Sequence, residues 1–160
     1  MKYYGYMPND FINGENISVS LWTAGCPHRC KGCHNSEMWD YKNGYEVPTD
    51  IKGQLIKAIS ANGLVRNFSI LGGEPLSEEN RDFILTIVQA IRTAYPSIKF
   101  FLWTGYTIEE LKNMEDEKIN SILENIDVLI DGKYDESLRN VTLELRGSSN
   151  QRILKRNIDF

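Results

Sequence analysis

The chain has 160 residues, enough for one domain of ordinary size, and its 41 % hydrophobic and 25 % charged residues exclude an intrinsically disordered protein. Its net charge of -4 argues against a surface that coats nucleic acid, and its apolar runs fall far short of the ~20 residues of a membrane span. The N-terminus has no apolar stretch typical of a secretory signal. We therefore expect one cytoplasmic domain over residues 1–160, with neither nucleic acid nor a membrane as partner.

Residues 17–22 alternate apolar and polar, which predicts a strand that leads directly into a cysteine loop, residues 26–33. This loop contains all three cysteines of the chain, Cys26, Cys30 and Cys33, at the spacing C-x3-C-x2-C. An odd number of cysteines in one short loop is a poor disulfide framework. The pattern instead indicates a metal or metal-cluster site whose thiols stay reduced.

Two kinds of metal site compete for this loop. One is zinc, with His28 or His34 as fourth ligand beside the three thiolates. The other is an iron–sulfur cubane held by three thiolates, with one iron left open. Zinc sites more often draw ligands from two separate parts of a chain, and His34 directly follows Cys33, where joint ligation of one ion is awkward. The loop by itself favours the cluster and leaves zinc open.

Further along the chain, strands and helices alternate. Apolar residues at helical spacing over 51–59 predict a helix, and a short strand over 68–71 runs into Gly72-Gly73-Glu74-Pro75. Ser77 is a candidate N-cap for a long amphipathic helix that ends before Pro96. This pattern is typical of a sheet covered by helices.

The second half of the chain repeats the alternation. A buried strand over 98–103 leads into Thr104-Gly105-Tyr106, and Thr107 with Glu110 predicts a capping box for the next helix. After a further helical stretch, the fourth predicted strand covers residues 128–130. It ends in the sequence Asp131-Gly132-Lys133.

The order of these elements predicts an α/β fold with a parallel sheet and right-handed crossovers. A complete eight-stranded barrel needs about 250 residues, so we expect a partial, open parallel β/α barrel. In such a fold, the loops after the strands emerge at one end, where active sites form. Four loops should meet there, namely residues 26–33, 72–75, 104–106 and 131–133.

The cysteine triplet followed by Gly72-Gly73-Glu74-Pro75 resembles the radical S-adenosylmethionine (SAM) superfamily. Within it, the short chain and several flanking residues resemble the proteins that activate anaerobic ribonucleoside-triphosphate reductase. The resemblance covers essentially the whole chain. The flanking residues are Asn13-Gly14-Glu15-Asn16, Gly25-Cys26, Gly32-Cys33 and Trp39.

The resemblance implies that Cys26, Cys30 and Cys33 bind three irons of one [4Fe–4S] cluster, and that the amino and carboxylate groups of SAM chelate the fourth. It also implies that the backbone of Gly72–Pro75 accepts hydrogen bonds from the SAM amino group, because glycine allows close approach. Within that segment, Glu74 is expected to order the loop and not to act as an acid or base.

Other contacts with SAM are implied in the same way. Thr104 matches a position near the methionine moiety, and Asp131 with Lys133 resembles a D-x-K element around SAM. Many superfamily members have an aromatic residue just before the third cysteine, where this chain has a glycine. His34 and Asn35 are therefore our candidates for the adenine contact.

Several residues have less specific interpretations. His28, between two thiols, is expected to face solvent, and Trp22 and Trp103 are expected to lie in the core. The basic segment 146–156 is expected to be a solvated tail. The alternative is that its polar part, residues 146–152, contacts SAM or a partner.

The implied function is that of a glycyl-radical activase, an oxidoreductase. The reduced cluster would cleave SAM to methionine and a 5′-deoxyadenosyl radical, which takes a hydrogen atom from a glycine of the anaerobic ribonucleotide reductase catalytic subunit. A one-electron donor such as flavodoxin would reduce the cluster. Two alternatives remain, a small-molecule radical SAM enzyme similar to 7-carboxy-7-deazaguanine synthase, and a non-enzymatic protein such as a zinc-stabilised interaction domain or an electron carrier.

Overall fold

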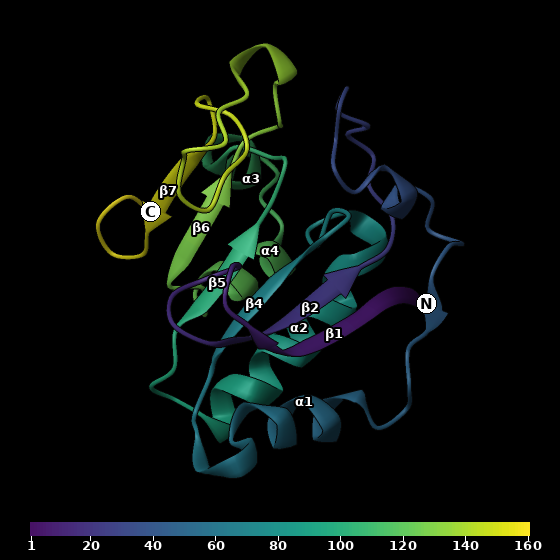
Figure 1. Ribbon diagram of the computed structural model, residues 1–160, viewed down its shortest axis with the longest axis vertical. Coiled ribbons are helices and arrows are strands. Elements are labelled where there is room, and N and C mark those ends of the chain that lie inside the picture. The colour runs from purple at the N-terminus through teal and green to yellow at the C-terminus, as the bar shows by residue number, and fades with distance from the viewer.

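One seven-stranded mixed sheet is the framework of the molecule in the computed structural model, which describes residues 1–160 (Figure 1). Its strand order is β3-β1-β2-β4-β5-β6-β7, and the sheet is not closed, because β3 and β7 form its two edges. The four central strands run parallel, as the sequence predicted for these strands. They are β2 (Ser18–Thr23), β4 (Asn67–Gly72), β5 (Phe100–Trp103) and β6 (Val128–Asp131).

The three outer strands are antiparallel to their neighbours, and the sequence did not predict them. β1 (Lys2–Asp10) pairs with β2, and the short β3 (Tyr45–Glu46) pairs with β1. β7 (Arg152–Lys155) pairs with β6, so the C-terminal segment is part of the sheet and not the solvated tail that we expected. The expectation of a parallel sheet was therefore only partly correct.

Four helices lie on one face of the sheet, behind it in the view of Figure 1. The strands alternate accordingly, because successive side chains of a strand point to opposite faces. Phe100 and Leu102 are buried in the large core beneath the helices, whereas Phe101 packs in a smaller cluster on the other face. The helices are α1 (Ile51–Ile59), α2 (Glu78–Ala94), α3 (Ile108–Asn113) and α4 (Glu117–Leu123).

The helix caps agree with the sequence in part. The Thr107 hydroxyl accepts from the Glu110 amide at 3.2 Å and the Glu110 carboxylate accepts from the Thr107 amide at 2.8 Å, which confirms the predicted capping box. Ser77 is the N-cap residue of α2, but its side chain makes no cap hydrogen bond. None of the four helices is long and apolar enough to cross a membrane.

The four parallel strands end at one edge of the molecule. Thr23 pairs with Gly72, and Trp103 pairs with Ile130, one residue before the end of β6. The loops that follow therefore leave from the same end of the sheet. In Figure 1, the cysteine loop and the segment between β6 and β7 both lie beyond that end.

Candidate functional site

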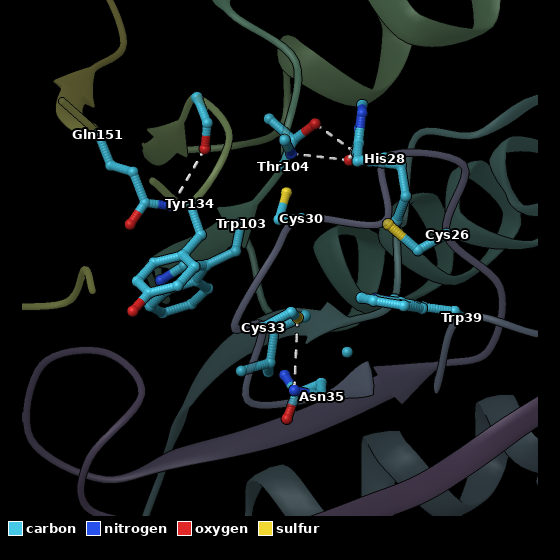
Figure 2. Close-up of a pocket in the computed structure, with 16 residues that line it drawn as sticks. Cys26, His28, Cys30, Cys33, Asn35, Trp39, Trp103, Thr104, Tyr134 and Gln151 are labelled. Atoms are coloured by element: carbon cyan, nitrogen blue, oxygen red, sulfur yellow. Dashed lines mark hydrogen bonds and ion pairs between the residues drawn. The ribbon is translucent and has the colours of Figure 1, made fainter. Parts of the chain in front are cut away.

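A pocket opens where the four strands end, and all three cysteines line it. Figure 2 shows Cys26, Cys30 and Cys33 around this hollow, with aromatic side chains on two sides of it. Each cysteine is half-buried and free, without a disulfide. The topology thus brings the three thiols together with the strand-end loops, as the sequence predicted.

Backbone hydrogen bonds fix the start of the cysteine loop. The amide of Gly25 donates to the Met38 carbonyl at 2.7 Å, and the amide of Cys26 donates to the Trp39 carbonyl at 3.0 Å. Gly25 has a φ of +90°, and the Tyr41 ring lies where its Cβ would be. Only glycine fits that backbone conformation and that contact.

Burial suppresses ionisation of two of the thiols. It raises the pKa of Cys26 to about 11, although the amides of His28 and Arg29 partly offset it. Burial also raises the pKa of Cys30, against the opposing effect of the Tyr134 amide. Thiolates at these two positions therefore require a nearby positive charge, which bound metal supplies.

The three free thiols are the candidate metal ligands of this pocket. Three half-buried thiols around one pocket fit an iron–sulfur cluster, whose sulfurs also accept backbone amides. Such an amide is present at Cys33, whose sulfur lies 3.4 Å from the Asn35 nitrogen.

The glycine-rich loop after β4 touches the cysteine loop directly. The amide of Glu74 donates to the Gly25 carbonyl at 2.7 Å, and the amide of Gly73 donates to the Thr23 carbonyl at 2.9 Å. A Cβ on Gly73 would lie 2.3 Å from the Gly25 carbonyl oxygen. The two loops can be this close only because residue 73 has no side chain.

The Glu74 carboxylate joins three of the loops. It is fully buried and accepts hydrogen bonds from the Leu76 amide at 2.9 Å, the Thr104 hydroxyl at 2.8 Å and the Gly105 amide at 2.7 Å. Its fourth partner is His28 Nε2 at 2.8 Å. We expected His28 to face solvent, and this was wrong, because its side chain is only 6 % exposed.

The predicted site residues fall into two groups. Asn35, Gly72, Gly73, Glu74 and Thr104 line the pocket together with the three thiols. The other four do not line it, namely His34, Pro75, Asp131 and Lys133.

Three of the predicted residues that do not line the pocket are Asp131, Lys133 and His34. Asp131 is fully buried and accepts hydrogen bonds from the Ile108 amide at 2.8 Å and from Arg152 Nε at 2.9 Å. Lys133 is exposed and lies in a neighbouring surface cavity. The His34 ring is exposed, 6.0 Å from the Tyr134 ring.

The pocket also has walls that sequence reasoning missed. Trp103 was expected in the core, but it is only partly buried and lines the pocket, while its Nε1 donates to the Leu145 carbonyl at 2.6 Å. Gln151 reaches the pocket because β7 returns beside β6, and its amide donates to the Gly132 carbonyl at 3.0 Å. The only indication of this in the sequence was the polar character of residues 146–152, which include Gln151. Trp39 and Tyr134 complete the aromatic walls.

Comparison with known proteins gives the class to which this fold and site belong. The model of a family described as "4Fe-4S single cluster domain" matches residues 12–154. That match supports an iron–sulfur cluster in this domain.

Curated relatives give a narrower identification. Three anaerobic ribonucleoside-triphosphate reductase-activating proteins match nearly the full chain. That of Vibrio cholerae is 36 % identical over 94 % of this chain and 96 % of its own length. Those of Enterobacteria phage T4 and Escherichia coli K12 are each 35 % identical, over 96 % and 94 % of this chain and over 93 % and 96 % of their own lengths. The chain therefore belongs to the family of anaerobic ribonucleoside-triphosphate reductase-activating proteins, which confirms the resemblance seen in the sequence.

Proposed function

We propose that the chain acts as one radical SAM domain that generates the glycyl radical of an anaerobic ribonucleotide reductase. Cys26, Cys30 and Cys33 would hold a [4Fe–4S] cluster, reduced by a one-electron donor such as flavodoxin. When bound, the cluster supplies the electron that cleaves SAM to methionine and a 5′-deoxyadenosyl radical, which takes a hydrogen atom from a partner glycine. The observation that carries this proposal is the meeting of three free thiols and the glycine-rich loop in one pocket.

The pocket residues have distinct roles in this proposal. Gly72 and Gly73 line the pocket without side chains, so the SAM ammonium group can reach their carbonyl oxygens. Asn35 is the adenine candidate that the pocket supports, because His34 lies outside it. Trp39 and Trp103 exclude water, which protects a radical from side reactions.

Three predicted residues support the pocket from outside in this proposal. Asp131, bound to Arg152, would fix the end of β6 and the returning β7 and would not touch SAM. The charge of Lys133 partly opposes the burial that raises the pKa of Cys30, so it would favour the thiolate. Pro75 would set the turn after the glycine pair.

A second cavity offers a route for the partner glycine. It shares Cys33, Asn35 and Trp103 with the pocket, so the two are neighbours. Its outer part is lined by Ile12 and Val141, each 80 % exposed. Two such apolar side chains at the rim fit contact with a protein surface better than contact with solvent. We propose that the glycine-bearing segment of the reductase enters here.

Single cysteine substitutions test the cluster assignment. Cys26→Ala, Cys30→Ala and Cys33→Ala should each abolish 5′-deoxyadenosine formation after anaerobic reconstitution with iron and sulfide and addition of dithionite. Far-UV circular dichroism should change little, because the thiols are not part of the apolar core. Thr86→Ala on the exposed side of α2, where the hydroxyl bonds only the Asp82 carbonyl, is the control and should retain turnover.

Two outcomes would contradict this assignment. One is SAM cleavage that persists in all three cysteine variants. The other is a wild-type protein that takes up stoichiometric zinc and no iron, which would favour the zinc-stabilised domain. Cleavage of SAM without any radical on the reductase would retain the chemistry but favour a small-molecule substrate.

A further inference from the structure

We infer that His28 is a positioning residue that fixes the segment between Cys26 and Cys30 against the loops after β4 and β5. This inference rests on the proposed function, because it assigns the role of His28 to placing two of the cluster thiols. Nothing in the reaction requires a histidine to donate or accept a proton. The role follows from three contacts of the His28 side chain.

The first contact is a buried hydrogen bond. His28 Nε2 lies 2.8 Å from Glu74 Oε2, and the two side chains are only 6 % and 1 % exposed. An ionised carboxylate can only accept, so Nε2–H is the donor of this bond, beside the Gly105 amide that donates to the same oxygen at 2.7 Å. The bond joins residues 46 positions apart in the sequence.

The second and third contacts place the imidazole ring. A Cβ on Gly105 would lie 2.4 Å from His28 Cδ2, so the ring occupies the space that a side chain at residue 105 would fill. On another side, the Tyr106 ring meets it edge to face, with ring centres 4.4 Å apart. The ring is therefore held by packing as well as by its hydrogen bond.

The position of His28 makes this attachment important for the thiols. It lies two residues after Cys26 and two before Cys30, and residues 27–29 make no other side-chain hydrogen bond. Pro27 and Arg29 are exposed. The Cys26 end is separately fixed by the bond from its amide to the Trp39 carbonyl. Loss of the His28 contacts should therefore loosen the placement of Cys30 relative to Cys26, and leave the Arg29 guanidinium over the Trp39 ring and the Tyr134 amide at Cys30 as the remaining restraints.

Two substitutions separate the hydrogen bond from the ring. His28→Phe retains a flat ring of similar size and removes the Nε2–H donor, whereas His28→Gln restores an N–H at a similar reach. We expect the reconstituted His28→Phe protein to lose iron to a ferrous chelator under anaerobic conditions at least about tenfold faster than the wild type. Its SAM affinity, read from the change that SAM causes in the EPR spectrum of the reduced cluster, should fall as well. His28→Gln should restore most of both properties.

A matched control separates positioning from general loss of stability. Tyr95→Phe removes a half-buried hydroxyl that bonds Ser60 Oγ at 2.6 Å, far from the pocket. It should lower the urea midpoint of the metal-free protein without changing iron release or the EPR response to SAM. Gly105→Ala is a second probe that keeps His28 but displaces its ring, and it should reproduce the faster iron release.

The outcomes distinguish failure of the His28 role from failure of the proposed function. If the wild type holds a cluster and cleaves SAM while His28→Phe and Gly105→Ala match it in iron release and SAM affinity, the positioning role is wrong and the function stands. Failure of His28→Gln to restore what His28→Phe loses would also contradict the role of the hydrogen bond. A wild type that holds no cluster would overturn both proposals.

Discussion

A methyl group on Gly73 would meet the carbonyl oxygen of Gly25 at 2.3 Å, a distance that no relaxed structure tolerates. The close approach that the sequence suggested for a bound ligand is thus also an approach between two loops of the chain itself. Glycine at residue 73 allows the loop after β4 to lie on the cysteine loop. The position of the thiols relative to the glycine-rich loop therefore depends on the absence of a side chain at residue 73.

Gly73→Ala should therefore destabilise the metal-free protein, by about 1–3 kcal/mol in the free energy of unfolding, because backbone atoms must shift to admit the methyl group. Urea denaturation measures this loss. Gly53→Ala is the matched control: residue 53 lies in α1 with nothing within 4 Å of an added Cβ. That change should raise stability by roughly 0.5–1 kcal/mol, as alanine favours a helix over glycine. Equal effects at the two positions would contradict the loop contact.

Part of the site could be predicted from individual residues and their spacing. The cysteine spacing and the Gly72–Pro75 loop predicted the pocket, because strand-end loops of a parallel sheet must meet. The bond from His28 to Glu74 was not predictable, since its two residues belong to different loops and the motif around each does not reveal the partner of its side chain. Trp103 was assigned to the core because a tryptophan in an apolar strand usually lies there.

At the scale of elements, the two helix starts at Thr107 and Ser77 differ in what their side chains do. Thr107 makes a complete capping box with Glu110, whereas the buried Ser77 hydroxyl makes no hydrogen bond. We expect Thr107→Ala to cost about 1 kcal/mol of unfolding free energy. Ser77→Ala should be close to neutral, because it removes a buried polar group that has no partner. Urea unfolding of both variants checks this, and a larger loss at Ser77 would contradict the assigned caps.

The strands divide into those that the sequence could predict and those that it could not. β4, β5 and β6 have apolar runs, and β2 alternates apolar and polar residues; all four end in loop signals, so their existence was clear. The long β1 contains Gly5 and Pro8, which normally argue against a strand. β7 is four residues with a charge at each end, and it is a strand only because β6 offers it an edge. In that pairing Arg152 lies opposite Asp131, 21 positions earlier in the chain. Such a pairing depends on the tertiary fold and cannot be predicted from the local sequence.

At the scale of the whole molecule, Asp127 joins elements that are distant in the chain. Its carboxylate accepts from the Phe100 amide at 2.8 Å, from Arg92 of α2 at 2.9 Å and from Arg156 beyond β7 at 2.8 Å. Burial alone would raise the pKa of Asp127, but these hydrogen bonds outweigh it and hold the pKa below its usual value. A lowered pKa in the folded state stabilises the fold above the unfolded-state pKa of about 3.9.

That stabilisation is lost as the pH falls through the folded-state pKa of Asp127, so acid should weaken the wild type more than Asp127→Asn. At pH 7 the free energy of unfolding of the variant should be lower by roughly 1–3 kcal/mol. The reason is that a neutral amide accepts weaker hydrogen bonds than the charged carboxylate of Asp127. The difference should narrow between about pH 5 and pH 3. Urea unfolding of the metal-free proteins across this range measures it, and a constant difference would show that the Asp127 charge is not involved.

The central claim, that the pocket directs a radical to a glycine of another protein, has a direct test. Reconstituted protein, SAM and dithionite are mixed without oxygen with an anaerobic ribonucleotide reductase catalytic subunit whose glycines carry deuterium at Cα. We predict an organic radical on the catalytic subunit by EPR and deuterium in the 5′-deoxyadenosine by mass spectrometry, both lost in Cys30→Ala. 5′-Deoxyadenosine without deuterium, and no radical on the subunit, would contradict the claim.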